Sequence, residues 1–309
     1  MPLAIKILFF LLLFLSCSGM ISPPIALTAG IFFGLTFPHP FLERSRTTAR
    51  FLLQVSVVAL GFGMNLHEVL QAGRSGFVYT AVGISFALIV GLAIGKILRV
   101  RNNSSYLITT GTAICGGSAI AAIGPILRAD DEQMAVSLGT VFILNSIALL
   151  IFPPIGNALH LSQSQFGLWA ALAIHDTSSV VGATAKYGAQ ALVIGTTVKL
   201  ARALWIVPLA LVTAALKRSK TRVPFPWFVL FFCLAAIMNT YVPTFITFNK
   251  SVFTLGRLGL TATIFLIGTG ISRSTIQAVG SRPLLQGILL WIFVGLTSLY
   301  FIRTGAIAL

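Results

Sequence analysis

Residues 191–211 read ALVIGTTVKLARALWIVPLAL, an apolar stretch that carries two cations, Lys199 and Arg202, near its middle. A hydrophobic segment of about 20 residues is long enough to cross a bilayer as a helix. A Lys or Arg at the centre of such a helix costs about 2.5–3.5 kcal/mol on insertion scales. The pair therefore predicts a polar site inside a membrane protein, where these charges face protein, water or a ligand.

The composition supports a membrane protein throughout the chain. Of the 309 residues, 57% are hydrophobic and only 9% are charged, whereas soluble domains carry about a quarter charged residues. Charges gather in short patches between long apolar runs, which is typical of an all-α polytopic transmembrane bundle and not of an outer-membrane barrel. We expect one membrane domain over residues 1–309. The net charge of +15 reflects basic loops, so it does not indicate nucleic-acid binding.

Apolar runs separated by charged or proline-rich breaks predict about eleven helices. The first of them could also be a signal peptide, because Lys6 precedes an apolar run that ends in small residues. A transmembrane helix is the favoured interpretation of that segment. The predicted spans are 3–19, 22–37, 48–66, 76–98, 105–126, 132–152, 164–185, 190–214, 225–241, 251–271 and 284–302.

Basic residues between the predicted helices favour one side of the membrane. Thirteen of them fall in loops on one side, five on the other, and Lys199, Arg202 and Arg257 fall within helices. Loops rich in Lys and Arg stay in the cytoplasm. We therefore expect a multi-pass protein of a bacterial-type inner membrane, with the N-terminus cytoplasmic and the C-terminus periplasmic or extracellular.

Two features are interpreted as structural. The pairs Gly30 and Gly34, and Gly91 and Gly95, have the small-xxx-small spacing that lets helices approach closely. The acidic residues 130–132 precede the sixth predicted helix, where carboxylates stabilise a helix N-terminus. We expect the glycines to serve packing and the acids to serve as a solvated cap.

Two predicted helices contain stretches that disfavour a smooth apolar helix. Residues 110–120 read TGTAICGGSAI and residues 173–182 read AIHDTSSVVG. Adjacent glycines weaken a helix, and clustered Asp, Thr and Ser hydrogen-bond to nearby backbone instead. Such breaks are tolerated in membranes only where they line a cavity or are buried in protein. In transporters, the half-helix N-termini at these breaks present free N–H groups to an anion.

The balance of charge inside the membrane points to an anion. Lys199, Arg202 and Arg257 are cations there, and Asp176 is the one firmly buried acid expected. Lys199 and Arg202 are three residues apart and share a helix face. We expect Asp176 to pair with one of them, which leaves a positive surplus. The alternative is that both cations form fixed ion pairs or extend to a helix end.

Two further polar residues admit different roles. His175 could relay protons, since its pKa lies near physiological pH, or it could be a hydrogen-bonded structural residue. Asn145 is a lone polar residue in the sixth predicted helix. We expect Asn145 to hydrogen-bond between helices rather than to contact a substrate.

With these motifs the chain resembles the YeiH-like sulfate exporter family, many of whose members are known only as uncharacterised membrane proteins. The resemblance rests on several runs and covers nearly the whole chain. The runs are residues 112–122, 175–183 and 199–202, Leu60-Gly61-Phe62-Gly63 followed by Leu66, and Pro226-Trp227-Phe228.

The resemblance implies a secondary transporter related to the cation–proton antiporter and anion transporter clan. That clan builds inverted repeats with broken helices that cross near the membrane centre. Carried onto this chain, the crossing elements are residues 115–118 and 175–179. A five-helix repeat would instead pair the fifth predicted helix with the tenth, around residues 268–270, and the sequence leaves the register open.

The leading hypothesis is a secondary active transporter that exports a small inorganic or organosulfur anion, such as sulfate or sulfite, by alternating access. The residues expected to bind the anion are Lys199, Arg202, Gly116, Gly117, Ser118, Ser178 and Ser179. Asp176 and His175 are the candidate coupling residues. Membrane lipid and a coupling ion, either a proton or sodium, are the other expected partners.

Two alternatives remain open from sequence. One is a proton- or sodium-coupled antiporter in which Asp176 carries the ion and the cation pair is a structural counter-charge. The other is a non-transporting membrane protein or an intramembrane enzyme. The sequence lacks the Gly-x-Ser-x-Gly and His-Glu-x-x-His motifs of hydrolases and metalloproteases. We therefore expect no enzyme activity, metal or cofactor.

Overall fold

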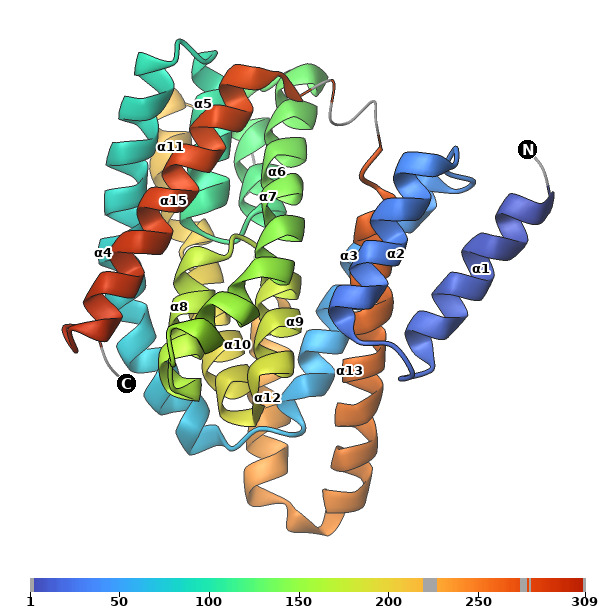
Figure 1. Ribbon diagram of the computed structural model, residues 1–309. Coiled ribbons are helices and arrows are strands. Elements are labelled where there is room, and N and C mark those ends of the chain that lie inside the picture. Colours follow the sequence, from blue (N-terminus) through green and yellow to red (C-terminus); the bar gives the residue numbers. More distant parts are fainter. Residues whose placement is uncertain (1–2, 219–226, 273–276, 278, 308–309) are drawn as a thin grey trace. The chain divides into compact units, whose positions relative to one another are not determined.

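The computed structural model describes residues 3–218, 227–272, 277 and 279–307. The described residues form fourteen α-helices and one short 3-10 helix, and no strand is found among them. This confirms the all-α bundle, with more helices than the eleven predicted. The chain divides into two compact units, Met1–Leu70 with Trp227–Arg273 and Gln71–Pro226 with Ser274–Leu309. Figure 1 labels the helices along the chain.

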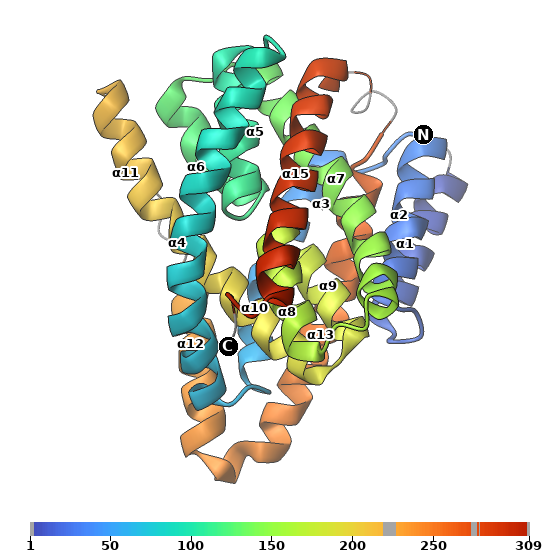
Figure 2. The same cartoon turned by 60° about the vertical axis from the view of Figure 1, so that its left-hand side comes forward.

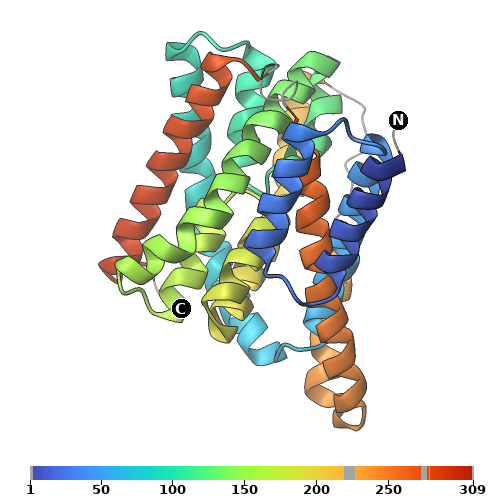
Figure 3. The ribbon, with the colours of Figure 1, turned by 45° about the vertical axis from the view of Figure 1, so that its right-hand side comes forward.

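Unit 1 is built around α13 (Ile246–Thr269), which packs against α1 (Leu3–Cys17), α2 (Pro23–Thr36) and α3 (Leu42–Gly61). The same unit contains α12 (Trp227–Tyr241), which packs on α3, and the 3-10 helix η1 (Pro243–Phe245). Figure 3 shows α13 in orange beside the blue helices of this unit. The rings of Phe9, Phe33 and Phe265 pack together and are almost fully buried. The apolar first segment is therefore a packed helix in this structure.

The close helix contacts predicted from small residues are confirmed. A Cβ built on Gly34 of α2 would lie 2.6 Å from the carbonyl oxygens of both Thr269 and Ile271. In unit 2, a Cβ built on Gly91 would lie 2.5 Å from Cγ2 of Thr109. Only a residue without a side chain permits these separations.

His39 closes the loop between α2 and α3 in its neutral form. Its Nδ1 accepts a hydrogen bond from the Phe41 amide at 3.0 Å, and its Nε2 lies 3.0 Å from Oγ1 of Thr269. Because Thr269 Oγ1 donates to the Leu266 carbonyl at 2.7 Å, the ring donates through Nε2. Burial, assisted by the nearby positive charge of Arg46, lowers the pKa of His39 from its ordinary value of 6.5.

We expect this histidine to make unit 1 less stable in mild acid. The unfolded chain takes up a proton at His39 near pH 6.5, whereas the folded chain resists it. The free energy of unfolding should therefore fall as the pH drops below about 6.5 and level off below the pKa in the fold. Thermal unfolding of purified protein in detergent between pH 5 and 8 measures this slope. His39→Gln should flatten it, and an unchanged slope in that variant would contradict the assignment.

Unit 2 contains the predicted functional segments. It comprises most of α4 (Leu66–Ile97), then α5 (Asn102–Ala113), α6 (Gly117–Leu127) and α7 (Asp131–Ala158). The chain continues with α8 (Gln163–Ala173), α9 (Thr177–Tyr187), α10 (Ala189–Ala203) and α11 (Ile206–Lys217), and α15 (Ser281–Arg303) completes the unit. In Figures 1 and 2, α5 and α6 lie towards one end of this unit, and α8, α9 and α10 lie towards the other.

The helices α5 and α6 form a hairpin, named here hairpin 1, with its tip at residues 114–116. Leu107 of α5 and Ile123 of α6 belong to one hydrophobic cluster, and a Cβ on Gly111 would lie 2.9 Å from Cδ1 of Ile120. At the open end, Arg101 forms salt bridges with Asp130 at 3.3 Å and with Glu132 at 3.2 Å. The chain therefore leaves hairpin 1 at the end where it entered.

The helices α8 and α9 form a second hairpin, hairpin 2, with its tip at residues 174–176. The ring of Phe166, near the start of α8, stacks on that of Tyr187, at the end of α9, with centroids 3.7 Å apart. The Tyr187 hydroxyl donates to the Leu161 carbonyl at 2.7 Å. Helices of 11 or 12 residues extend about 17 Å, so each arm reaches only about halfway through a bilayer core of about 30 Å.

These hairpins refine the sequence prediction. The expected breaks are confirmed, but segments 105–126 and 164–185 each turn back instead of continuing as a single span. The acids before α7 act as a cap, as predicted: Asp130 accepts a hydrogen bond from the Gln133 amide at 2.7 Å.

The two hairpins of unit 2 are each followed by a long span, and the two segments run in opposite directions. The long helix α7 starts beside the open end of hairpin 1, and a Cβ built on Gly156 near its end would meet the rings of Phe166 and Tyr187 of hairpin 2. The pair α10 and α11 runs the other way, since Gln163 of hairpin 2 accepts from the Gln190 amide at 3.0 Å and Lys217 lies near Leu127 of hairpin 1. Each hairpin is therefore followed by a long span, and the second hairpin and span run opposite to the first, while the pairing with residues 268–270 stays a prediction.

Five helices of the described residues are long and apolar enough to cross a membrane. A sixth span results if the bent pair Leu42–Gly61 and Leu66–Arg74 is counted as one. The five are Tyr79–Ile97, Asp131–Ala158, Ala189–Lys217, Ile246–Thr269 and Ser281–Arg303. The protein is therefore a multi-pass membrane protein by length and composition.

Candidate functional site

The tips of the two hairpins meet inside unit 2. A Cβ built on Gly116 of hairpin 1 would lie 3.3 Å from Cβ of Asp176 of hairpin 2. At each tip one helix ends and the next begins, so a negative dipole end adjoins a positive one. All nine residues predicted as substrate-binding or coupling lie at these tips, in the first turns of α6 and α9, or on α10, the helix that packs against hairpin 2.

Lys199 satisfies the carbonyl end of hairpin 2. It is fully buried in α10, and its Nζ donates to the carbonyls of Ile174 at 2.6 Å and Ala171 at 3.4 Å. The last carbonyls of a helix lack intrahelical partners and carry the negative end of the dipole. The ammonium group is therefore stabilised by the C-terminal end of α8.

Arg202 joins the two tips. Its Nε donates to the Ala113 carbonyl at 2.6 Å and its Nη2 to the Thr112 carbonyl at 3.4 Å, both at the end of α5. Its Nη1 donates to the Leu172 carbonyl of α8 at 2.6 Å. The planar guanidinium, with five donors in fixed directions, suits such a bridge better than an ammonium group does. The side chain is 1% exposed.

Asp176 caps the start of α9. Its Oδ1 accepts from the Ser179 amide at 2.6 Å and from the Ser178 hydroxyl at 2.7 Å, and its Oδ2 accepts from the Ser179 hydroxyl at 3.1 Å. A carboxylate is a favoured N-cap because it meets free N–H groups at a positive dipole end. The expected ion pair of Asp176 with Lys199 or Arg202 is not formed: every salt bridge within the described residues involves exposed side chains elsewhere.

Asn145 of α7 holds the tip of hairpin 2 from the other side. Its Oδ1 accepts from the amides of His175 at 3.1 Å and Asp176 at 3.3 Å. This confirms the prediction that Asn145 hydrogen-bonds between helices. Its Nδ2 is buried without a hydrogen-bond partner, as are both ring nitrogens of His175 and Oγ1 of Thr112. Unpaired polar atoms in a protein interior are costly, and four of them gather here where the two hairpins meet.

Three features of the surroundings were missed in the sequence. The His175 ring faces that of Trp291 on α15, with centroids 6.4 Å apart. Gln286 of α15 is fully buried, and its Nε2 donates to the Gly91 carbonyl at 3.0 Å and to the Ser105 hydroxyl at 2.9 Å. Arg257, predicted to be a buried cation, is exposed on α13. Of these three features, only the burial of Gln286 could have been predicted, because Gln286 is a polar residue inside an apolar run.

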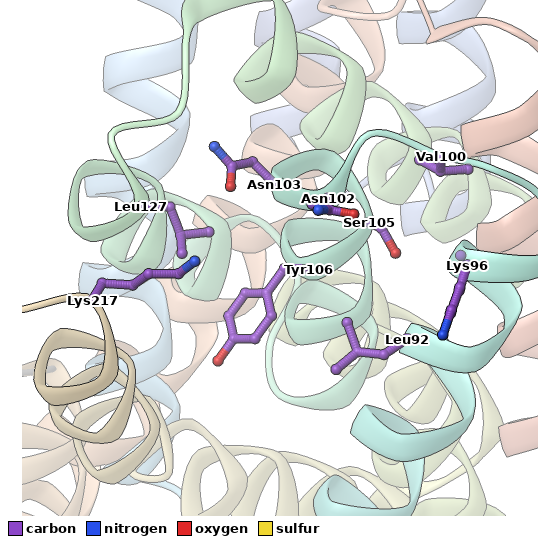
Figure 4. Close-up of a pocket in the computed structure, with 10 residues that line it drawn as sticks. Leu92, Lys96, Val100, Asn102, Asn103, Ser105, Tyr106, Leu127 and Lys217 are labelled. Atoms are coloured by element: carbon purple, nitrogen blue, oxygen red, sulfur yellow. The ribbon is translucent and has the colours of Figure 1, made fainter.

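A cavity of about 350 Å³ lies at the open end of hairpin 1, away from the tips. Figure 4 shows the amines of Lys96 and Lys217 on either side of the Tyr106 ring. None of the predicted site residues lines this cavity. Across the part of the chain that the structure describes, no group of three His, Cys, Asp or Glu side chains could hold a metal ion.

Comparison with known proteins places the chain in a family. The family described as conserved hypothetical protein 698 matches residues 3–298. A UPF0324 membrane protein of Bacteroides thetaiotaomicron is 50% identical over 288 residues, which cover 92% of this chain and 87% of that protein. A UPF0324 membrane protein of Porphyromonas gingivalis is 50% identical over 290 residues, 92% of this chain and 88% of that protein.

A relative in Geobacter sulfurreducens, also a UPF0324 membrane protein, is 45% identical over 295 residues, which cover 96% of this chain and 95% of that protein. The YeiH-like label inferred from the sequence motifs agrees with these matches. The chain therefore belongs to the conserved hypothetical protein 698 family of UPF0324 membrane proteins.

Proposed function

We propose that this protein is a secondary active transporter that moves a small anion by alternating access, with the meeting hairpin tips as the substrate site. The proposal rests on one observation: two hairpins, whose arms each reach about halfway through the bilayer core, meet around buried charges inside a membrane protein. Irregular backbone at membrane depth is tolerated where it lines a substrate pathway. Sulfate or sulfite export is the specific form suggested by the family resemblance.

Charge at the tips supports an anion over a cation. Each tip joins one helix C-terminus to one N-terminus, so the two dipole ends of a hairpin cancel to a first approximation. Among the buried side chains of the described residues, Lys199 and Arg202 are the cations and Asp176 is the acid. These two cations and one acid leave one positive charge in excess, which an anionic substrate would balance.

The roles of the predicted residues follow from their contacts. Lys199 and Arg202 donate hydrogen bonds to backbone carbonyls. The hydroxyls of Ser178 and Ser179 donate to the Asp176 carboxylate. We propose that these residues hold the tips and set their positive potential. The backbone at Gly116, Gly117 and Ser118 would then contact the anion, since Ser118 is exposed at the start of α6.

The hairpins also sharpen the proposed orientation. Because Arg101 pairs with Asp130 and Glu132, the loop that contains Arg128 lies at the same end as the one that contains Arg101. Arg128 thus moves to the basic side, and the loop cations divide fourteen to four instead of thirteen to five. By the positive-inside rule, we propose a bacterial inner-membrane protein with a cytoplasmic N-terminus and a C-terminus outside.

Flux measurements in proteoliposomes test the proposed function. Purified protein would be reconstituted and assayed with sulfate, sulfite, short sulfonates, carboxylates and chloride, under imposed proton or sodium gradients and without them. We expect saturable, protein-dependent flux of at least one oxyanion, and empty liposomes serve as the control. Absence of flux for every anion under every gradient would overturn the proposal.

Asp176→Asn separates this function from the antiporter alternative. Asparagine is as good an N-cap as aspartate, so the thermal stability should change by less than about 1 kcal/mol. Under the proposal, loss of one negative charge leaves anion flux in place and strengthens anion binding severalfold. An ion-coupled antiporter that uses Asp176 would instead lose all gradient-driven flux, which the same proteoliposome assay reports.

A further inference from the structure

The two hairpin tips carry related sequences but differ at one decisive position. Residues 113–118 read AICGGS and residues 173–178 read AIHDTS. In this register the N-cap residues of the two helices coincide, Gly116 for α6 and Asp176 for α9. The start of α9 thus has a built-in carboxylate, whereas the start of α6 has no side-chain cap.

The backbone at Gly116 excludes a side chain of its own. Gly116 has φ +65°, a conformation that residues with a Cβ rarely adopt, and a built Cβ would also lie 3.2 Å from Cγ1 of Val141. The first amides of α6, those of Gly117 and Ser118, have no partner within the helix. Among the described hydrogen bonds that surround this tip, neither amide donates to another group. The start of α6 therefore lacks the carboxylate that caps α9, and the side chain that meets it is that of Cys115, which hydrogen-bonds with the Ala119 amide and the Ser118 side chain.

A second donor points to the same place. Asn145 Nδ2 lies 3.6 Å from the position that a Cβ on Gly116 would occupy, and it has no hydrogen-bond partner. The side chain is only 2% exposed. Its orientation is fixed, because Oδ1 must accept the amides of His175 and Asp176. The amide donor is therefore held towards the uncapped end of α6.

We infer that the anionic group of the substrate binds at the start of α6. There it accepts hydrogen bonds from the helix N-terminus, as the Asp176 carboxylate does at the start of α9. This inference rests on the proposed function and assigns its substrate class. The donors are the Gly117 and Ser118 amides and Asn145 Nδ2. They suit a compact oxyanion with several acceptor oxygens, such as a sulfate, sulfonate or carboxylate group, and not a metal cation.

The variant Asn145→Asp, which places a negative charge beside the proposed anion site, tests the inference. This variant keeps an oxygen for the amides of His175 and Asp176 but replaces the free donor with a carboxylate oxygen. Asn157→Asp, the same change on the same helix at an exposed position, is the matched control. Inorganic sulfate is the probe, with binding measured on purified protein in detergent at pH 8.

We expect Asn145→Asp to weaken sulfate binding by a factor of 100 or more and Asn157→Asp to leave it unchanged. The unfolding temperature without sulfate should stay close to wild type in both variants. Equal sulfate affinity in the two variants would overturn the inference.

A protection measurement covers the case in which Asn145→Asp fails to fold. Ser118→Cys, introduced after Cys17, Cys115 and Cys233 have been replaced by Ala, places a thiol at the exposed start of α6. Sulfate should slow its reaction with a methanethiosulfonate reagent at the concentrations at which it binds. Absence of protection in a protein that still transports sulfate would overturn this inference and leave the proposed function standing. Failure of all anion flux would overturn the proposed function itself.

Discussion

Replacing Arg202 with Met should abolish anion flux and destabilise unit 2 more than removal of any other buried polar side chain there. The change removes the donors that bridge the ends of α5 and α8 while it keeps most of the side-chain volume. The carbonyls of Thr112, Ala113 and Leu172 then lose the donors that the structure gives them. A buried acceptor without a donor costs about 1–3 kcal/mol. Since the cost of burying the charge also disappears, we expect a net loss of about 2–4 kcal/mol.

Two further variants show whether the bridge itself matters. Arg202→Lys keeps the charge but cannot place donors on α5 and α8 at once, so it should recover part of the stability and little of the flux. Lys199→Met removes donors from hairpin 2 alone, so its effect on stability should be smaller than that of Arg202→Met. Thermal unfolding in detergent and flux in proteoliposomes measure both quantities. Wild-type flux and stability in Arg202→Met would contradict the bridging role.

The position of this cation pair could be predicted from sequence, but its partners could not. Lys199 and Arg202 stand out because charge inside an apolar segment is expensive. Their partners are main-chain carbonyls at the ends of α5 and α8, and a carbonyl has no sequence signature. The sequence supplied Asp176 as the only visible candidate for an ion pair. That carboxylate binds the free N–H groups of α9 instead, because Asp176 directly precedes this helix in the chain and serves as its N-cap.

The hairpins show a second limit of the same kind. Residues 105–126 are apolar and have a break in the middle, and this pattern fits a broken span as well as it fits a hairpin. The acids at 130–132 carried the missing information, because their partner Arg101 lies at the entrance of hairpin 1. Sequence reasoning interpreted them as a cap, which they are, but a cap does not reveal which end of the protein it occupies. Asn145 was likewise predicted to hydrogen-bond between helices, and only the fold shows that half of its amide remains free.

Gly30→Ala should produce a large loss of stability in unit 1, although it adds only one methyl group. A Cβ on Gly30 would collide with the carbonyl oxygen of Phe265 and lie 3.1 Å from Cα of Gly268 on α13. Both obstacles are backbone atoms, so neither can move aside without separating α2 from α13. Overpacking of this kind costs about 1–3 kcal/mol. The loss should appear as a lower unfolding temperature in detergent.

Gly83→Ala is the matched control, because no atom lies within 4 Å of a Cβ built at that position of α4. We expect it to be neutral or to stabilise the helix by up to about 1 kcal/mol. Gly268→Ala meets the same crossing from the other side, where its Cβ would lie 2.8 Å from the Leu27 carbonyl oxygen. Once one methyl group has separated the helices, there is room for the second. The double variant should therefore lose less free energy of unfolding than the sum of the losses in the two single variants. Equal unfolding temperatures for Gly30→Ala and Gly83→Ala would show that the crossing of α2 and α13 is looser than its backbone contacts require.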